Sequence, residues 1–212
     1  MKEYQVVLID KNPKNESEIL NMSFWEKAHC LTDFSSPWNS NPVLKIEFRA
    51  LWDLDYLYFN FQVFDSEVYV DRKDHSTDSI CNSDRVELFF RKDEKLSPYY
   101  CLEMDADARI LDFEAYPNWN FDYDWKWPEK QLEIQSIKEQ NSFTVAGRIS
   151  IASLEELDLI HNNTIETGVY RAKFSPNERE EYQPTWISWV NPNTAEPNFH
   201  IASSFGKFVL MK

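Results

Sequence analysis

Glycine is scarce in this chain of 212 residues, where only Gly147, Gly168 and Gly206 occur. Loops that cradle phosphate groups need clustered glycines, so the sequence contains neither a P-loop nor a dinucleotide-binding turn. The turns of the chain must then be made by Asn, Asp and Pro, which tolerate the backbone angles that turns require. The near-absence of glycine therefore excludes the commonest nucleotide-binding enzymes.

Cysteine and positive charge are also in short supply. Cys30, Cys81 and Cys101 form no C-x-x-C pair and no disulfide framework. Lys and Arg number 22 against 36 Asp and Glu, which gives a net charge of −14, and no basic stripe interrupts the acidic residues. Nucleic acids and anionic membrane surfaces are bound by clustered positive charge, so we expect neither as a partner.

Long apolar runs are missing as well. No stretch of the sequence reaches the length of a membrane span. The first ten residues hold one Lys and a short alternating run that ends at Asp10, which indicates a strand and not a secretory leader. We therefore expect a cytoplasmic protein unless a leader has been removed, and the sequence gives no indication of the oligomeric state.

Aromatic residues are plentiful, with 8 Trp, 10 Tyr and 15 Phe. Apolar and polar residues alternate most clearly in segments 44–51 and 56–64, which flank the polar turn at 52–55. An alternation of apolar and polar residues with period two predicts strands, and two such strands around a tight turn predict an antiparallel hairpin with one buried face.

Similar short runs recur along the whole chain with turn residues between them and little helix. We expect strands at 5–9, 44–51, 56–64, 67–70, 85–90, 99–104, 110–115, 132–137, 144–151, 170–174, 186–190 and 207–210, with short helical turns at 153–157 and within 21–31. The fold class is therefore all-β, a jelly-roll-like antiparallel β-sandwich of about ten to twelve strands. No linker or repeat divides it, so residues 1–212 are expected to form one domain.

Three segments occur in an order that resembles a known family. They are L-W-D at 51–53 followed by Y-L-Y and Asp65, then S-D-R-V-E-L-F at 83–89, and finally S-W at 188–189 followed by S-F-G-K-F at 204–208. Together they resemble the family 9 carbohydrate-binding modules, which accompany xylanases, and P-N-F-H at 197–200 is similar to a stand-alone branch. The resemblance implies a non-catalytic β-sandwich that serves polysaccharide catabolism and grips a sugar between two tryptophan faces.

The resemblance also suggests site residues. It places the two clamp positions at Cys81 and Phe199, and it matches Glu87 to a glutamate that accepts hydrogen bonds from sugar hydroxyls. Aromatic rings stack on the C–H faces of sugars, and polar side chains bind the hydroxyl groups. We expect an oligosaccharide or monosaccharide in a loop-rimmed cleft, contacted by residues of both kinds: Phe199, His200, Glu87, Glu103, Asp105, Trp119, Trp125 and Trp127.

Each of these residues has a structural alternative. Glu87, Glu103 and Asp105 could instead pair with arginines, and the tryptophans of loop 117–130 could fold back over the end of the sandwich. His200 could hold the C-terminal loop through a hydrogen bond. Trp52, Trp186 and Trp189 are expected to serve packing rather than ligand contact.

Two other functions are alternatives to sugar binding. A glycoside hydrolase, or an ancillary hydrolase, would use two of Glu87, Glu103 and Asp105 as acid and nucleophile. A haem-binding or small-ligand-binding sandwich would use Met104 and His200. We favour neither, and we expect no enzyme activity and no catalytic residues.

A metal site has one candidate location. Asp65, Asp71, Asp74 and Asp78 surround the loop that follows the first hairpin, and Ca²⁺ prefers oxygen ligands of this type. The alternative is a solvated acidic loop, because the spacing is not that of an EF-hand. The histidines have no spacing that suits zinc, and no other cofactor is expected.

Overall fold

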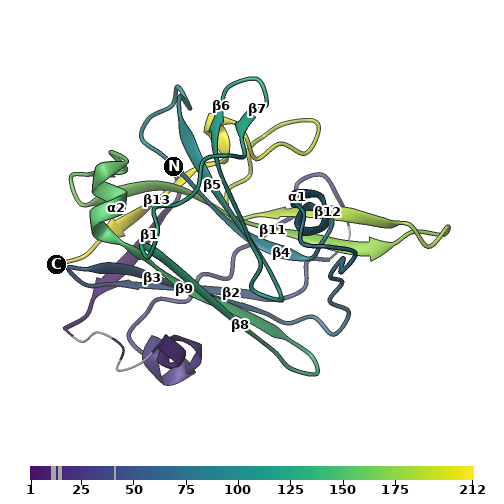
Figure 1. Cartoon of the computed structure of the whole chain (residues 1–212), viewed down its shortest axis with the longest axis horizontal. Helices are drawn as coiled ribbons and strands as arrows, with labels where there is room; N and C mark the ends of the chain where they lie inside the picture. Colours follow the sequence, from purple (N-terminus) through teal and green to yellow (C-terminus); the bar gives the residue numbers. More distant parts are fainter. Residues whose placement is uncertain (11–12, 14–15, 41) are drawn as a thin grey trace.

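The computed structural model describes residues 1–10, 13, 16–40 and 42–212 (Figure 1). Within these ranges the chain forms thirteen strands, two short α-helices and three 3₁₀ turns. In chain order they are β1 (Glu3–Leu8), η1 (Glu16–Leu20), η2 (Met22–Trp25), β2 (Ile46–Trp52), β3 (Tyr56–Val63), α1 (Thr77–Cys81), β4 (Arg85–Arg91), β5 (Tyr99–Asp105), β6 (Ile110–Tyr116), β7 (Asn120–Asp122), β8 (Leu132–Lys138), β9 (Phe143–Ser150), α2 (Ile151–Glu156), β10 (Ile160–His161), β11 (Thr164–Pro176), β12 (Tyr182–Ser188), η3 (Ala202–Ser204) and β13 (Gly206–Leu210).

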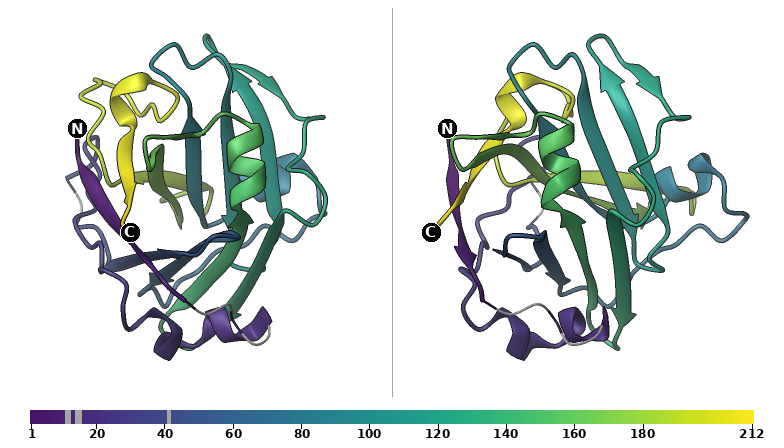
Figure 2. Two further views of the ribbon diagram at one scale, coloured as in Figure 1. Left: turned by 90° about the vertical axis from the view of Figure 1, so that its left-hand side faces the viewer. Right: turned by 60° about the vertical axis from the view of Figure 1, so that its left-hand side comes forward.

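The strands form one curled sheet that folds over on itself as a sandwich. Its order is β7-β6-β5-β4-β11-β13-β1-β2-β3-β9-β8, and β10 and β12 both pair with β11. The first four residues of β1 pair with β13, and its last two pair with β2, so β1 links the two layers. Figure 2 shows the first and last strands of the chain, β1 and β13, side by side where the layers join.

All strand pairings are antiparallel in the described residues except those of β1, which runs parallel to both of its neighbours. The predicted hairpin is β2–β3. Its turn is held by Asp53, whose carboxylate accepts hydrogen bonds from the backbone N–H groups of Asp55 and Tyr56 and from the Tyr58 hydroxyl. The Asp side chain thus stabilises the turn by accepting hydrogen bonds from the backbone two and three residues further on, and no glycine is needed.

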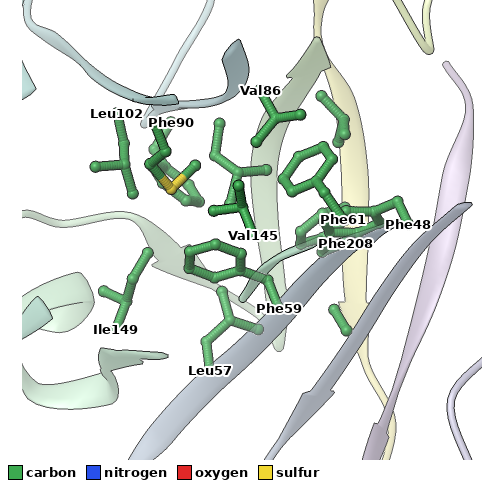
Figure 3. Packing of buried hydrophobic residues seen from close by; sticks show 14 of the residues in the cluster. Phe48, Leu57, Phe59, Phe61, Val86, Phe90, Leu102, Val145, Ile149 and Phe208 are labelled. Atoms are coloured by element: carbon green, nitrogen blue, oxygen red, sulfur yellow. The ribbon is translucent and has the colours of Figure 1, made fainter. Parts of the chain in front are cut away.

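The hydrophobic core lies between the two layers. At its centre Phe48 stacks on Phe208, with ring centroids 5.5 Å apart, and meets Phe61 edge-on at 4.8 Å (Figure 3). β4 contributes Val86 and the other alternate residues of its inner face. The alternation seen in the sequence thus places one face of each strand in this core, and the outer face of β4 and β5 is free for another use.

The sequence predicted the all-β sandwich correctly. It also placed most strands, and α2 and η2 occupy the two expected helical turns. Segment 67–70 is not a strand, because its backbone serves other contacts, such as the hydrogen bond from Asp84 N to the Tyr69 carbonyl. β12 begins four residues before its predicted start, and α1, β7 and β10 were not predicted. No helix in the described ranges is long and apolar enough to cross a membrane.

Candidate functional site

The outer face of β4 and β5, which points away from the core between the two layers, carries several charged side chains. Residues that alternate with the core positions point outward, and on these strands they include Arg85, Glu87 and Glu103. Around them the outer face is covered by a second apolar cluster, which includes Phe89, Cys101 and residues of the C-terminal loop. The charged residues are therefore enclosed rather than exposed.

Arg85, Glu87 and Glu103 form one compact group, called here the Arg85 cluster. The Nε atom of Arg85 lies 2.9 Å from a Glu87 oxygen and 2.7 Å from a Glu103 oxygen. Only 4% of Arg85, 1% of Glu87 and 5% of Glu103 is exposed. Arg85 also donates a hydrogen bond to the Cys81 carbonyl at 2.5 Å, and its guanidinium lies 5.5 Å from the ring of Trp186.

The two carboxylates of the cluster are direct cross-strand neighbours in the β4–β5 register. Like charges in this position destabilise a sheet, and one guanidinium serves both. Burial raises the pKa of Glu87, and the nearby charge of Glu103 raises it further. Burial also raises the pKa of Glu103, against the pull of Arg85. Groups that cost stability and have perturbed pKa values are typical of functional sites.

A pocket of about 400 Å³, called here the outer pocket, opens above this cluster. Arg85 and Glu103, on the outer face of the sheet, form its floor, and Cys81 and His200 also line it. Its walls are mostly aromatic and come from β6, β7, β11 and β12 and the residue after β7, with Phe113, Phe121, Tyr123, Phe174, Tyr182 and Trp186. Figure 1 shows α1 and the β11–β12 hairpin at the same end of the molecule, where they border this pocket.

His200 lines the outer pocket and also contacts residues that lie outside it. Its Nδ1 lies 2.8 Å from the Tyr99 hydroxyl, and its ring is 5.1 Å from Phe89 and 5.0 Å from Trp119. Burial and the positive charge of Arg85 lower the pKa of His200 to about 4. The imidazole is therefore neutral at pH 7, and it presents a hydrogen-bonding group without charge.

Phe199 and Trp119 lie beside the outer pocket rather than in it. Both line a smaller hollow of about 70 Å³, together with Trp186, Asn198 and His200. Phe199 is buried and stacks on Tyr170 at 4.1 Å, so one of its faces is already covered. Trp119 is 59% exposed and offers an open ring.

Trp125, Trp127 and Asp105 are not brought to this site. Trp127 is buried in the main core, where its indole N–H donates to the Ser153 hydroxyl at 3.0 Å. Trp125 packs on Tyr100 at 4.9 Å. Asp105 binds Arg109 at 2.6 Å. Loop 117–130 therefore divides its tryptophans: two fold back over the core, and Trp119 stays outside.

The four aspartates proposed for calcium are committed to other contacts or spread along the loop. Asp65 pairs with Arg171 and with Lys173, the latter at 3.1 Å. Asp71 and Asp74 accept hydrogen bonds from backbone N–H groups of their own turns, and Asp78 lies in the first turn of α1. Across the described ranges, no three His, Cys, Asp or Glu side chains are grouped to hold a metal. A calcium site here stays a prediction.

Several pocket residues were missed from the sequence. Arginines were expected only as possible partners of the carboxylates, so Arg85 was not identified as a pocket residue, and Trp186 was expected to serve packing. Tyr182, Pro184 and Trp186 alternate along β12 and all line the outer pocket. That period-two pattern was a signal for a strand with an aromatic face, but it was obscured by the predicted strand start at residue 186. Phe121 and Tyr123 gave no such signal, because β7 has only three residues and Tyr123 lies just after it.

Comparison with known protein families gives a match over most of the chain. Residues 21–212 match the model of a family described as "Carbohydrate family 9 binding domain-like". No protein among the curated proteins matches the chain.

Solved structures share the fold at low sequence identity. A "putative carbohydrate-binding protein" from Bacteroides uniformis ATCC 8492 is 15% identical with a TM-score of 0.73, over 99% of each chain. A family 9 carbohydrate-binding module from Caldicellulosiruptor kristjanssonii was solved with glucose and with cellotriose. Both structures are 14% identical to this chain with a TM-score of 0.63, over 99% of this chain and 96% and 93% of theirs.

Proposed function

This chain belongs to the carbohydrate family 9 binding domain-like family, and we propose that its outer pocket is the place where it binds a neutral sugar. Domains of this family are non-catalytic, so the chain is a carbohydrate-binding module and not an enzyme. The hydrolase alternative is overturned by that assignment. Of its three candidate carboxylates, Asp105 is paired with Arg109 outside the outer pocket, and Glu87 and Glu103 are both paired with Arg85.

The haem alternative has no support in the geometry. Met104 is fully buried in the core between the two layers, whereas His200 lies over the outer face of the same layer. The two side chains therefore lie on opposite sides of the sheet and cannot hold the two faces of one group.

The observation that carries the proposal is a desolvated Arg–Glu pair on the floor of an aromatic pocket. A sugar hydroxyl both donates and accepts hydrogen bonds, so it can donate to Glu103 and accept from Arg85 at the same time. Hydrogen bonds to charged groups contribute about 1.5–3 kcal/mol each. Arg85 and Glu103 are already held in place by their ion pair, so few side chains have to be ordered when the sugar binds.

The aromatic walls supply the other half of sugar recognition. Trp186 and Tyr123 both line the outer pocket, one from β12 and one from the chain after β7. Their rings offer flat apolar surfaces on which the C–H groups of a pyranose can pack. These two side chains take the place of the clamp that the family resemblance located at Cys81 and Phe199.

The charge of the pocket favours uncharged sugars. The Arg85 cluster contains one positive and two acidic groups, and the whole chain carries a net charge of −14. A uronic acid would bring a carboxylate against Glu103 with no free cation to meet it, since Arg85 is already shared. Support for neutral ligands also comes from the structurally similar module, which was solved with glucose and cellotriose. Binding such chain fragments would serve polysaccharide breakdown.

Calorimetric titration with glucose, cellotriose, xylobiose and glucuronic acid tests this function. We expect binding of at least one neutral sugar and weaker or no binding of glucuronic acid. The variants Trp186→Ala and Glu103→Gln should each reduce affinity about tenfold or more, equal to about 1.4 kcal/mol. Glu133→Gln, which removes a carboxylate from an arginine pair on β8, is the matched control and should bind like the wild type. Absence of binding to every neutral sugar at millimolar concentration would refute the proposal.

A further inference from the structure

We propose that the outer pocket is the middle of a continuous groove, which takes an internal stretch of a neutral polysaccharide chain rather than a chain end. This inference rests on the proposed function and extends it, because it states how much of the ligand is bound. It depends on two hollows that adjoin the outer pocket, one on each side, and on the aromatic rings that line them.

The three hollows share their walls. The smaller hollow of about 70 Å³, called here the Trp119 hollow, shares Trp186 and His200 with the outer pocket. A third hollow of about 320 Å³, called here the Tyr69 hollow, shares Phe174 and Tyr182 with it. Because the shared residues differ, the two hollows adjoin the outer pocket at different places. A ligand seated over Glu103 can therefore extend in both directions.

β12 sets the length of this surface. Tyr182 and Trp186 point to the same side of the strand, with Pro184 between them, and all three line the outer pocket. Four residues of a strand extend about 13 Å, at roughly 3.3 Å each, which is more than the width of one pyranose ring. One sugar unit cannot contact both aromatic residues and still lie over Glu103, so the surface suits several linked units.

Open aromatic rings mark both ends of the groove. In the Tyr69 hollow, Tyr69 and Tyr182 stack with centroids 3.5 Å apart and an interplanar angle of 14°, and Tyr182 is 41% exposed. In the Trp119 hollow, the exposed ring of Trp119 lies 5.0 Å from His200. An exposed tryptophan at one end of a polar floor, and at the other the exposed Tyr182 stacked on the half-buried Tyr69, are what a sugar chain would contact.

The backbone at Trp119 adds to this argument. Asn118 and Trp119 both have left-handed φ angles, 65° and 60°, in the turn between β6 and β7. This conformation is uncommon for a bulky side chain and costs of order 1 kcal/mol or more. Trp119 is therefore exposed in a backbone conformation that Asn or Gly would adopt at lower cost. Contact between its indole and a ligand would explain why a tryptophan occupies this position.

Chain-length dependence of binding tests the groove. We expect calorimetry to show an affinity that rises about tenfold or more from glucose through cellotriose to cellopentaose, equal to about 1.4 kcal/mol or more. Cellopentaose reduced with borohydride, which has no closed ring at its reducing end, should bind within about twofold of the untreated sugar, a difference below about 0.5 kcal/mol. An affinity that stops rising at one or two units, or that is lost on reduction, would overturn the groove.

Two variants locate the ends. Trp119→Ala and Tyr69→Ala should each lower the ratio of cellopentaose to glucose affinity, whereas Trp186→Ala should lower the affinity for both sugars. Ile137→Ala, an exposed apolar residue on β8 in the other layer, is the control and should leave the ratio unchanged. If glucose binds but length brings no gain, the groove fails and the proposed function stands. If no neutral sugar binds at all, both fail.

Discussion

The Arg85 cluster should make the stability of the protein fall as pH rises, and Glu103→Gln should largely remove that fall. In the folded protein, burial and the nearby charge of Glu103 raise the pKa of Glu87 to about 8, and burial raises the pKa of Glu103. In the unfolded chain both carboxyls titrate near pH 4.3. Between these values the folded state holds a proton that the unfolded state has released, so unfolding becomes easier with increasing pH.

The size of the effect follows from proton linkage. One extra bound proton changes the free energy of unfolding by about 1.4 kcal/mol per pH unit. His200 works in the opposite direction below pH 6.5, because burial lowers its pKa to about 4, so stability rises with pH until the unfolded histidine is neutral. Between about pH 6.5 and 8 the pH dependence of stability therefore reports the two carboxyls without His200. Over this range one extra bound proton lowers the free energy of unfolding by about 2 kcal/mol.

Urea unfolding at several pH values in this window measures it. The wild type should lose about 2 kcal/mol between pH 6.5 and 8, and Glu103→Gln, which leaves Glu87 as the only carboxylate on Arg85, should lose less than half as much. Glu133→Gln, on β8, should behave like the wild type. If Glu103→Gln loses as much stability as the wild type over this range, the Arg85 cluster does not hold the extra proton. The claim that its carboxyl pKa values are raised is then refuted.

Three further substitutions test separate parts of the structure by urea unfolding. Trp127→Ala should cost about 3–5 kcal/mol, because the residue is buried in the core, and should leave sugar affinity unchanged; a loss of affinity would contradict its placement. Arg171→Ala should cost about 3–5 kcal/mol, because it leaves the buried Asp65 and Asp84 with Lys173 alone, and a neutral result would show that the pair is dispensable. Tyr4→Phe should cost about 1–2 kcal/mol, since its hydroxyl bridges the His29 carbonyl and the Ala50 N–H.

The fold could be predicted from the sequence because its strands keep a strict period of two. Phe48 and Phe61 were placed on one face by alternation, and both lie in the core. The parallel pairing of β1 could not be predicted, because its partners β2 and β13 lie at distant places in the chain. Segment 67–70 has the composition of a strand, but within the described part of the chain it pairs with none, and its Tyr69 carbonyl accepts a hydrogen bond from Asp84 N instead.

The site was only partly predictable. Glu87 and Glu103 were selected as ligand-binding carboxylates, and they lie together because β4 and β5 are neighbours in register. The aromatic walls depend on which loop residues fold outward, and local pattern does not determine that: Trp119 and Trp127 come from one loop and end on opposite faces. The importance of Arg85 emerged only when both carboxylates were found on the same guanidinium.

The most direct test of the central claim is a crystal structure of the protein with cellotriose. We predict that a sugar ring lies in the outer pocket against Trp186, with a hydroxyl within hydrogen-bonding distance of Glu103, and that the chain continues toward Trp119 or Tyr69. Cellotriose bound elsewhere, for example in the hollow of about 320 Å³ between the end of β1 and the turn at Asp53, would contradict the account.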